Sequence, residues 1–120
     1  MIAFSLAAAL SLLWFGVHLF MGGRDVAAPL RASDLDPVVR DTSYLCWHLT
    51  SCSLLLIAVF FGLAAFAGEP AYAVAGTLLS TGFAVVGIAM TPLIKQSYAQ
   101  LPQGWLFVPV TGLGLWALVS

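Results

Sequence analysis

Histidine and cysteine are the residues of this chain best suited to chemistry, and both types lie in apolar surroundings. His18 and His48 are the only histidines, and Cys46 and Cys52 are the only cysteines. An imidazole can exchange a proton near neutral pH, and imidazole and thiolate together can ligate a metal ion. Ionisable side chains within apolar segments are candidates for function by default. The search for a site therefore starts from the two histidines.

Helical spacing decides which of these side chains can act together. Successive residues of a helix are about 100° apart, so Cys46 and His48 point about 160° apart and cannot bind one ion together. Cys52 follows His48 by one helical turn and can share its ligand. His18 and His48 each lie about 9 to 10 Å along a helix from the nearest charged residue. Their rings lie at matching depth and can meet if the two helices are neighbours.

A bis-histidine haem b is one hypothesis for this pair. His18 and His48 would be the axial ligands, and Arg24 and Arg40 lie near enough to meet the propionates. Helices packed about 8 to 10 Å apart leave no room for a porphyrin. The haem hypothesis therefore requires the two helices to be splayed apart, or histidines from two protomers.

A soft metal ion and a small organic molecule are the other two hypotheses. His18, His48 and Cys52, with Met21 as a further ligand, form a donor set suited to Cu(I) or zinc. A quinone or another small molecule would instead bind between the first two helices, next to His48 and the arginines. Against all three stands a purely structural role, in which each imidazole bonds to a hydroxyl or a backbone carbonyl.

The distribution of charge along the chain indicates which segments form helices and therefore where the histidines and cysteines lie. The chain has 120 residues, 62% of them hydrophobic and 8% charged, whereas soluble domains are about 45 to 50% apolar and 25% charged. Residues 1–23, 42–68, 70–94 and 96–120 carry no charge, and each stretch exceeds the roughly 20 residues that span a bilayer as a helix. We therefore predict an all-α, polytopic membrane protein, a four-transmembrane-helix bundle forming a single membrane domain over residues 1–120.

Local signals set the expected helix boundaries. Gly22-Gly23 is expected to end the first helix, Asp36-Pro37 resembles an N-cap followed by proline, and Gly68-Glu69-Pro70 marks a tight break. The fourth helix is the shortest and contains Pro109, and Pro92 is expected to bend the third. The predicted helices are residues 2–21, 37–67 with its membrane span at 45–67, 71–94 and 102–120.

Four spans place both termini on one side of the membrane and the first and third connectors on the other. All basic residues lie in those connectors: Arg24, Arg31, Arg40 and Lys95. The positive-inside rule then makes the connectors cytoplasmic and both termini external. The expected location is a bacterial inner membrane.

Small and mildly polar residues mark the helix faces expected to pack. On the third helix such a face consists of Ala73, Thr77, Ser80, Ala84, Gly87 and Thr91. On the first helix Ser5, Ala9 and Gly16 share one side, and Ser11, Trp14 and His18 lie roughly opposite. Both sides are therefore expected to meet protein. The leading hypothesis is a non-enzymatic accessory or assembly subunit that acts through helix contacts with other membrane proteins or with a second copy.

The composition also excludes several classes of function. The net charge is −1 with four basic residues, so there is no basic surface for nucleic acid. No predicted span contains Asp, Glu, Lys or Arg, which disfavours an ion-coupled transporter. Hydrolase motifs such as HExxH and GxSxG are absent. No catalytic residues are assigned, and an enzyme is conceivable only through the histidines.

Overall fold

The computed structural model describes all residues, 1–120, and the chain is entirely helical with short connectors. The elements are α1 (Ile2–Val17), the π-helix η1 (His18–Ala27), α2 (Ala28–Arg31), α3 (Pro37–Ala67), α4 (Pro70–Leu93) and α5 (Gln103–Val119). The predicted all-helical class is confirmed.

The first three elements form one continuous helical rod from Ile2 to Arg31. The prediction that the helix ends at Gly22-Gly23 is wrong, because the chain continues through both glycines with a wider hydrogen-bonding pattern. At the end of η1 the backbone N–H of Ala28 donates to the carbonyl of Gly23, five residues earlier. Residues assigned to a flexible connector therefore extend the rod along α3.

Local capping sets the ends of the next two helices, as the sequence predicted. The Asp36 side chain accepts a hydrogen bond of 2.9 Å from the backbone N–H of Val38, and Pro37 occupies the first turn of α3. Gly68 ends α3 in the left-handed conformation at φ 70°, which glycine adopts without steric cost. Pro70 then opens α4, so α3 and α4 are joined by a two-residue turn.

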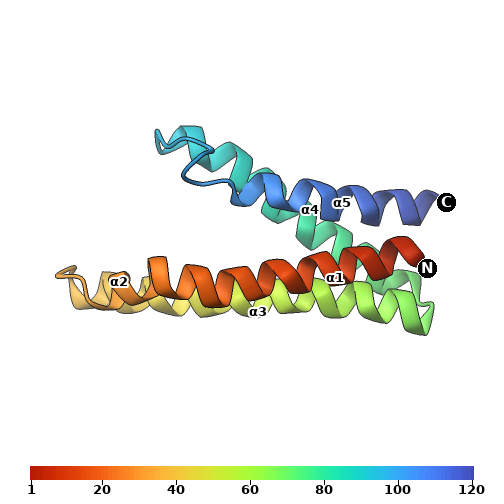
Figure 1. Cartoon of the computed structure of the whole chain (residues 1–120), viewed down its shortest axis with the longest axis horizontal. Coiled ribbons are helices and arrows are strands. Elements are labelled where there is room, and N and C mark those ends of the chain that lie inside the picture. Colours follow the sequence, from red (N-terminus) through yellow and green to blue (C-terminus); the bar gives the residue numbers. More distant parts are fainter.

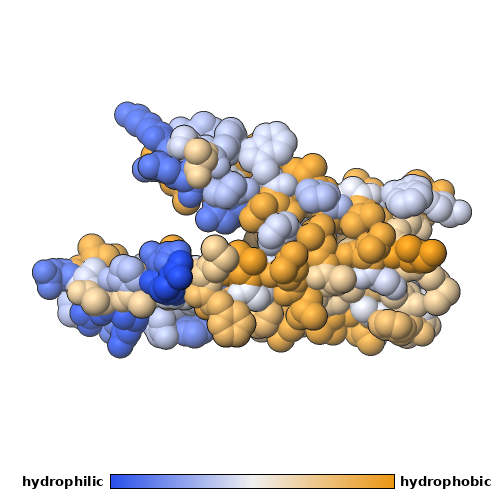
Figure 2. All heavy atoms as spheres, viewed as in Figure 1, coloured by the Kyte–Doolittle hydropathy of each residue, from blue (hydrophilic) through white to orange (hydrophobic).

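The helices form two pairs that lie together at one end of the molecule and diverge at the other (Figure 1). The rod of α1, η1 and α2 lies alongside α3, and α4 lies alongside α5. Both termini and the α3–α4 turn lie at one end of the molecule, which measures 50 Å along its longest axis. The two longer connectors lie at the other end, where the pairs diverge and the hydrophilic residues gather (Figure 2). This is the relative placement of termini and connectors that four antiparallel helices require.

The two pairs are joined by a core centred on Phe61 of α3. Its ring is fully buried, and it packs where a side chain on Gly76 or Gly114 would otherwise lie. The remaining core residues come from every long helix: Ala7, Leu54, Ile57, Ala84, Phe107 and Val110. Trp14 adds a polar link, because its indole N–H donates to the carbonyl of Leu106 at 3.0 Å.

Helices α4 and α5 pack more closely than any other pair in the chain. A Cβ placed on Gly87 would lie 2.5 Å from the Cα of Gly104, so the two backbones touch at this point. Further along, the Thr111 hydroxyl donates to the Ser80 hydroxyl at 3.1 Å. The predicted small-residue face of α4 is confirmed, with Ala73, Thr77, Ser80, Ala84 and Thr91 all buried.

The α4–α5 connector is tied back to α4 through a carbonyl group that proline leaves free. Pro92 has no N–H to donate to the carbonyl of Ile88, four residues earlier. The Tyr98 hydroxyl donates to that carbonyl instead, at 2.8 Å. The connector thus folds over the last turns of α4.

Three helical rods are long and apolar enough to cross a membrane: Ile2–Arg31, Pro37–Ala67 and Pro70–Leu93. Large apolar side chains such as Leu13, Leu78 and Val86 are exposed on them, as on helices that face lipid. The fourth helix, α5, is apolar but has 17 residues. At 1.5 Å per residue it is about 26 Å long, slightly less than a hydrocarbon core of about 30 Å.

Candidate functional site

His18 is the first residue of η1 and faces α3. Its ring stacks on the indole of Trp47, with 3.8 Å between ring centroids and 17° between planes. Its Nε2 lies 3.1 Å from the Ser51 hydroxyl and 3.4 Å from the backbone carbonyl of Trp47. The half-buried imidazole is therefore held by both an aromatic contact and a polar one.

Gly22 makes room for this arrangement. A Cβ on Gly22 would lie 2.6 Å from the Trp47 ring, so the indole occupies the space that a side chain would need. The close approach falls inside the π-helical segment, which widens the helix between His18 and Ala27. Such segments are rare and often mark functional positions.

His48 lies one turn from Tyr44 on α3 and is exposed. The two rings meet edge to face, with centroids 4.6 Å apart and planes at 88°. The Arg31 guanidinium, from the end of α2, lies over the Tyr44 ring at 5.0 Å from its centroid. His18 and His48 thus have different aromatic partners, although both belong to the same end of the α1–α3 pair.

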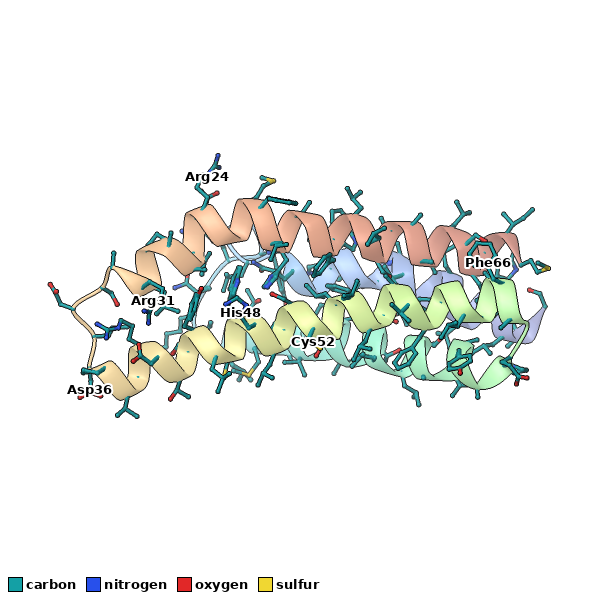
Figure 3. The ribbon with its side chains drawn as sticks, turned by 90° about the horizontal axis from the view of Figure 1, so that it is seen from below. Arg24, Arg31, Asp36, His48, Cys52 and Phe66 are labelled. Carbon is teal, nitrogen blue, oxygen red and sulfur yellow. The ribbon has the colours of Figure 1, made fainter.

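A pocket of about 290 Å³ lies between the extended first rod and α3. Its lining consists of Leu19, Gly23, Ala27, Ala28, Arg31, Tyr44, Trp47 and His48. Small residues of η1 and α2 form one wall, and the aromatic and histidine side chains of α3 form the other. Figure 3 shows Arg31 and His48 between the two rods, whereas Arg24 points away from α3. We call this the interhelical pocket.

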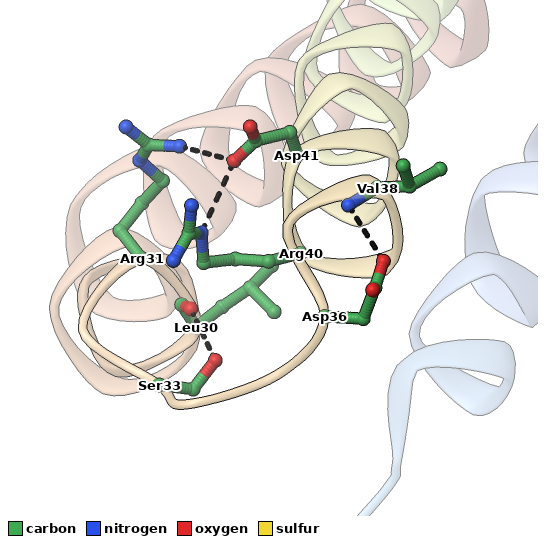
Figure 4. A network of polar contacts seen from close by, with 7 residues as sticks. All are labelled: Leu30, Arg31, Ser33, Asp36, Val38, Arg40 and Asp41. Atoms are coloured by element: carbon green, nitrogen blue, oxygen red, sulfur yellow. Dashed lines mark hydrogen bonds and ion pairs between the residues drawn. The ribbon is translucent and has the colours of Figure 1, made fainter.

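An ion-pair network fixes the polar end of the interhelical pocket (Figure 4). Arg31 and Arg40 both donate to the same Asp41 oxygen, at 2.8 and 3.1 Å. Arg31 and Asp41 are each about half exposed, so we expect each pair to contribute about 0 to 1 kcal/mol to stability. The network orients the Arg31 guanidinium more than it stabilises the fold.

A second surface feature is a groove on the outer side of α1. It has a volume of about 540 Å³ and is lined by Ala9, Leu12, Leu13, Gly16, Val17 and Met21. Nothing lies within 4 Å of the position that a Cβ on Gly16 would take. We call this the α1 groove.

The structure does not open the space that a haem would need within one chain. The first rod and α3 are in contact rather than splayed, and the ring of His18 lies directly on Trp47. The two arginines expected to meet propionates are paired elsewhere, Arg24 with Asp25 at 2.6 Å and Arg40 with Asp41. A porphyrin between these helices would have to separate His18 from Trp47 and Ser51.

The expected metal ligands are not gathered into one cluster. No group of three or more His, Cys, Asp or Glu side chains lies close enough together to hold a metal ion. Cys52 is exposed, and Met21 lines the α1 groove whereas His48 lines the interhelical pocket. Met21 and His48 therefore lie on different surfaces of the chain.

Sequence reasoning missed Tyr44 and gave no specific role to Trp47 and Arg31. Helical spacing held part of the signal, since Tyr44 and His48, like Trp47 and Ser51, are four residues apart and share a face. The sequence placed Arg31 in a connector, and its contact with Tyr44 arises because the helix continues and carries Arg31 back over that ring.

Comparison with known proteins finds no protein family, no curated protein and no solved structure that matches this chain. The fold alone does not imply a function.

Proposed function

We propose that this protein is a four-span integral membrane protein that acts as a non-enzymatic accessory subunit, by packing the outer side of α1 against a transmembrane helix of another membrane protein. The observation that supports it is the α1 groove, a shallow and open depression of about 540 Å³ along an apolar helix. Lipid chains offer no special reward for small residues on a helix, whereas a neighbouring helix does, because small residues let two backbones approach.

The two sides of α1 have different surroundings. Ser11 is buried, and Trp14 and His18 bond to α5 and α3, so the inner side is already used within the chain. Ser5 and Ala9 on the other side are exposed. In this proposal the inner side holds the bundle together and the outer side receives the partner.

The four-span topology rests on the pairing of α4 with α5. Both termini lie at the end of the molecule opposite the charged connectors, as an even number of spans requires. The basic residues Arg24, Arg31, Arg40 and Lys95 favour a cytoplasmic location for the connectors and an external one for the termini. A bacterial inner membrane is the proposed location.

Site-specific photo-crosslinking in native membranes tests the partner helix. A photoreactive amino acid at Leu13, in the α1 groove, should give a discrete protein adduct. Gly16→Ile should abolish that adduct, because the new side chain fills the groove. Gly62→Ile is the matched control, since Gly62 of α3 also has nothing within 4 Å of its Cβ position but lines neither surface feature.

The proposal fails if the probe at Leu13 labels only lipid, or if Gly16→Ile leaves a protein adduct unchanged. An adduct of twice the chain mass that depends on Gly16 would identify the partner as a second copy. Adducts lost equally in Gly16→Ile and Gly62→Ile would indicate disturbed insertion and would also count against the groove.

A small-molecule site is the second candidate function, and the interhelical pocket favours it. The pocket combines a positively charged group, an imidazole and aromatic rings with an apolar end, which is the composition expected of a ligand site. Haem and metal binding through His18 and His48 stay weaker proposals, because the first rod and α3 are in contact and no group of three or more His, Cys, Asp or Glu side chains is gathered. The accessory role and the ligand site do not exclude each other.

A further inference from the structure

The interhelical pocket crosses from the apolar part of the first rod to its charged end. Leu19 and Arg31 both line the pocket and are twelve residues apart in one continuous rod. Trp47 and Tyr44 line the pocket between them, and these two residue types favour the boundary between hydrocarbon and water. A molecule in the pocket would therefore have one end at the apolar segment and the other among charged groups.

The interhelical pocket has one formally charged lining residue, Arg31. None of its lining residues is acidic. Arg31 and Arg40 share the single carboxylate of Asp41, so these three side chains have a net charge of +1. Arg31 uses Nη1 for that ion pair, and since a guanidinium has five donor hydrogens, others are available to a ligand.

The position of Arg31 is defined rather than free. Asp41 holds the guanidinium from one side, and the face of Tyr44 lies 5.0 Å from its carbon. His48 meets the same ring in a T-shaped arrangement and adds a second donor group to the lining. A planar guanidinium held in this way suits paired hydrogen bonds to phosphate oxygens.

The apolar end of the pocket has room because its wall is built from small residues. Gly23, Ala27 and Ala28 present no large side chain, and Gly23 has nothing within 4 Å of its Cβ position. The end of the wall nearest the apolar segment is formed by Leu19. This end can receive the first carbons of an acyl chain, whereas the other end offers Arg31 and His48.

We propose that the interhelical pocket binds the phosphate-bearing headgroup of an anionic phospholipid, with Arg31 as the principal phosphate contact and His48 as a second. The lipid would lie against η1 and α2 on one side and Tyr44 and Trp47 on the other. This inference does not depend on the partner helix proposed above, because the pocket and the α1 groove share no residue.

The test is lipid retention by the full chain, measured by native mass spectrometry after reconstitution into vesicles of equal phosphatidylglycerol and phosphatidylcholine. We expect the protein to retain phosphatidylglycerol preferentially. Arg31→Gln should reduce this preference about tenfold, as the loss of a charge-assisted hydrogen bond predicts. Ala28→Leu should reduce it similarly without any change of charge, because Ala28 is exposed and lines the pocket.

Arg24→Gln is the matched control, since Arg24 belongs to the same rod but pairs with Asp25 away from the pocket. It should leave the preference within about twofold, because an exposed ion pair outside the pocket adds little. Equal loss in Arg24→Gln and Arg31→Gln would overturn the proposal, since it would indicate general surface charge. Equal retention of both lipids, or displacement by a neutral quinone but not by added phosphatidylglycerol, would also overturn it.

Addition of glycerol 3-phosphate distinguishes a phospholipid headgroup from a soluble phosphate ester, which would offer the same phosphate group to Arg31. If the acyl chains contribute, millimolar glycerol 3-phosphate should leave the bound phosphatidylglycerol in place. If it displaces the lipid completely, the pocket binds a soluble phosphate ester and the lipid assignment is wrong.

Discussion

The two helix pairs of this protein are similarly apolar but pack in opposite ways. The α4–α5 pair meets through glycine and hydroxyl-bearing residues, and its backbones touch at Gly87 and Gly104. The pair formed by the first rod and α3 meets through rings, with His18 on Trp47 and Arg31 over Tyr44. Small residues bring the backbones of α4 and α5 into contact at Gly87 and Gly104, and an open apolar groove of about 570 Å³ lies along the pair. Rings make the contact between the first rod and α3, beside a pocket that also contains polar groups.

This difference separates stability from function along the chain. Where the backbones of α4 and α5 touch, an added side-chain atom would disturb their packing. At the charged end of the first rod and α3, the stacked rings leave polar groups accessible. We therefore expect substitutions in the core and in α4–α5 to act mainly on stability, and substitutions around the interhelical pocket to act mainly on binding.

Phe61→Ala should have the largest effect on stability, because Phe61 joins the two helix pairs. Its ring is fully buried against Gly76 and Gly114, and removal of such a ring costs about 3 to 5 kcal/mol of unfolding free energy. Unfolding in mixed detergent micelles, followed by circular dichroism, measures the loss. Phe66→Ala is the control, since Phe66 is 86% exposed, and a similar loss there would contradict the assigned core.

Gly87→Ala should destabilise the α4–α5 pair by about 1 to 3 kcal/mol, the usual cost of overpacking a close contact. The added methyl group would meet the backbone of Gly104. Gly82→Ala, on the same helix but with nothing within 4 Å, should be neutral or stabilising by up to about 1 kcal/mol, because alanine favours helix. The same unfolding assay compares the two variants, and equal effects would refute the backbone contact.

His18→Ala and His48→Ala should differ in their effect on stability, although both residues lie at the same end of the α1–α3 pair. His18 stacks and hydrogen-bonds between the helices, so its loss should reduce stability by about 1 kcal/mol. His48 is exposed, and its replacement should change stability by less than about 0.5 kcal/mol. An absorbance spectrum and metal analysis of the same proteins test the cofactor hypotheses, which require binding that both substitutions abolish.

The helix ends set by neighbouring residues were predictable from the sequence. The end of the first rod depends on contacts with α3 and was not predictable. Asp36-Pro37 and Gly68 act within a few residues, so their effects on α3 can be read directly. Gly22-Gly23 looks like a terminus in isolation. In the structure the Trp47 ring packs on Gly22, and Arg31 reaches Asp41, so contacts with α3 extend the helix beyond the glycines.

The sequence placed both histidines near the charged end of their helices, but it did not give the geometry around them. His18 and His48 lie six and seven residues from the nearest charged residue of the sequence. Which way each ring points depends on the rotation of the first rod about its axis, and the π-helical segment changes that rotation after His18. The stacking of His18 on Trp47 and the approach of Arg31 to Tyr44 therefore required the folded structure.

The carbonyl that Pro92 leaves free bears on how the chain enters a membrane. Under the proposed four-span topology, α5 is slightly shorter than the hydrocarbon core and is a weak insertion signal on its own. The Tyr98 bond to Ile88 and the backbone contact at Gly87 and Gly104 attach the start of α5 to the end of α4. α4 and α5 would then insert as one helical hairpin, with the longer helix carrying the shorter one into the bilayer.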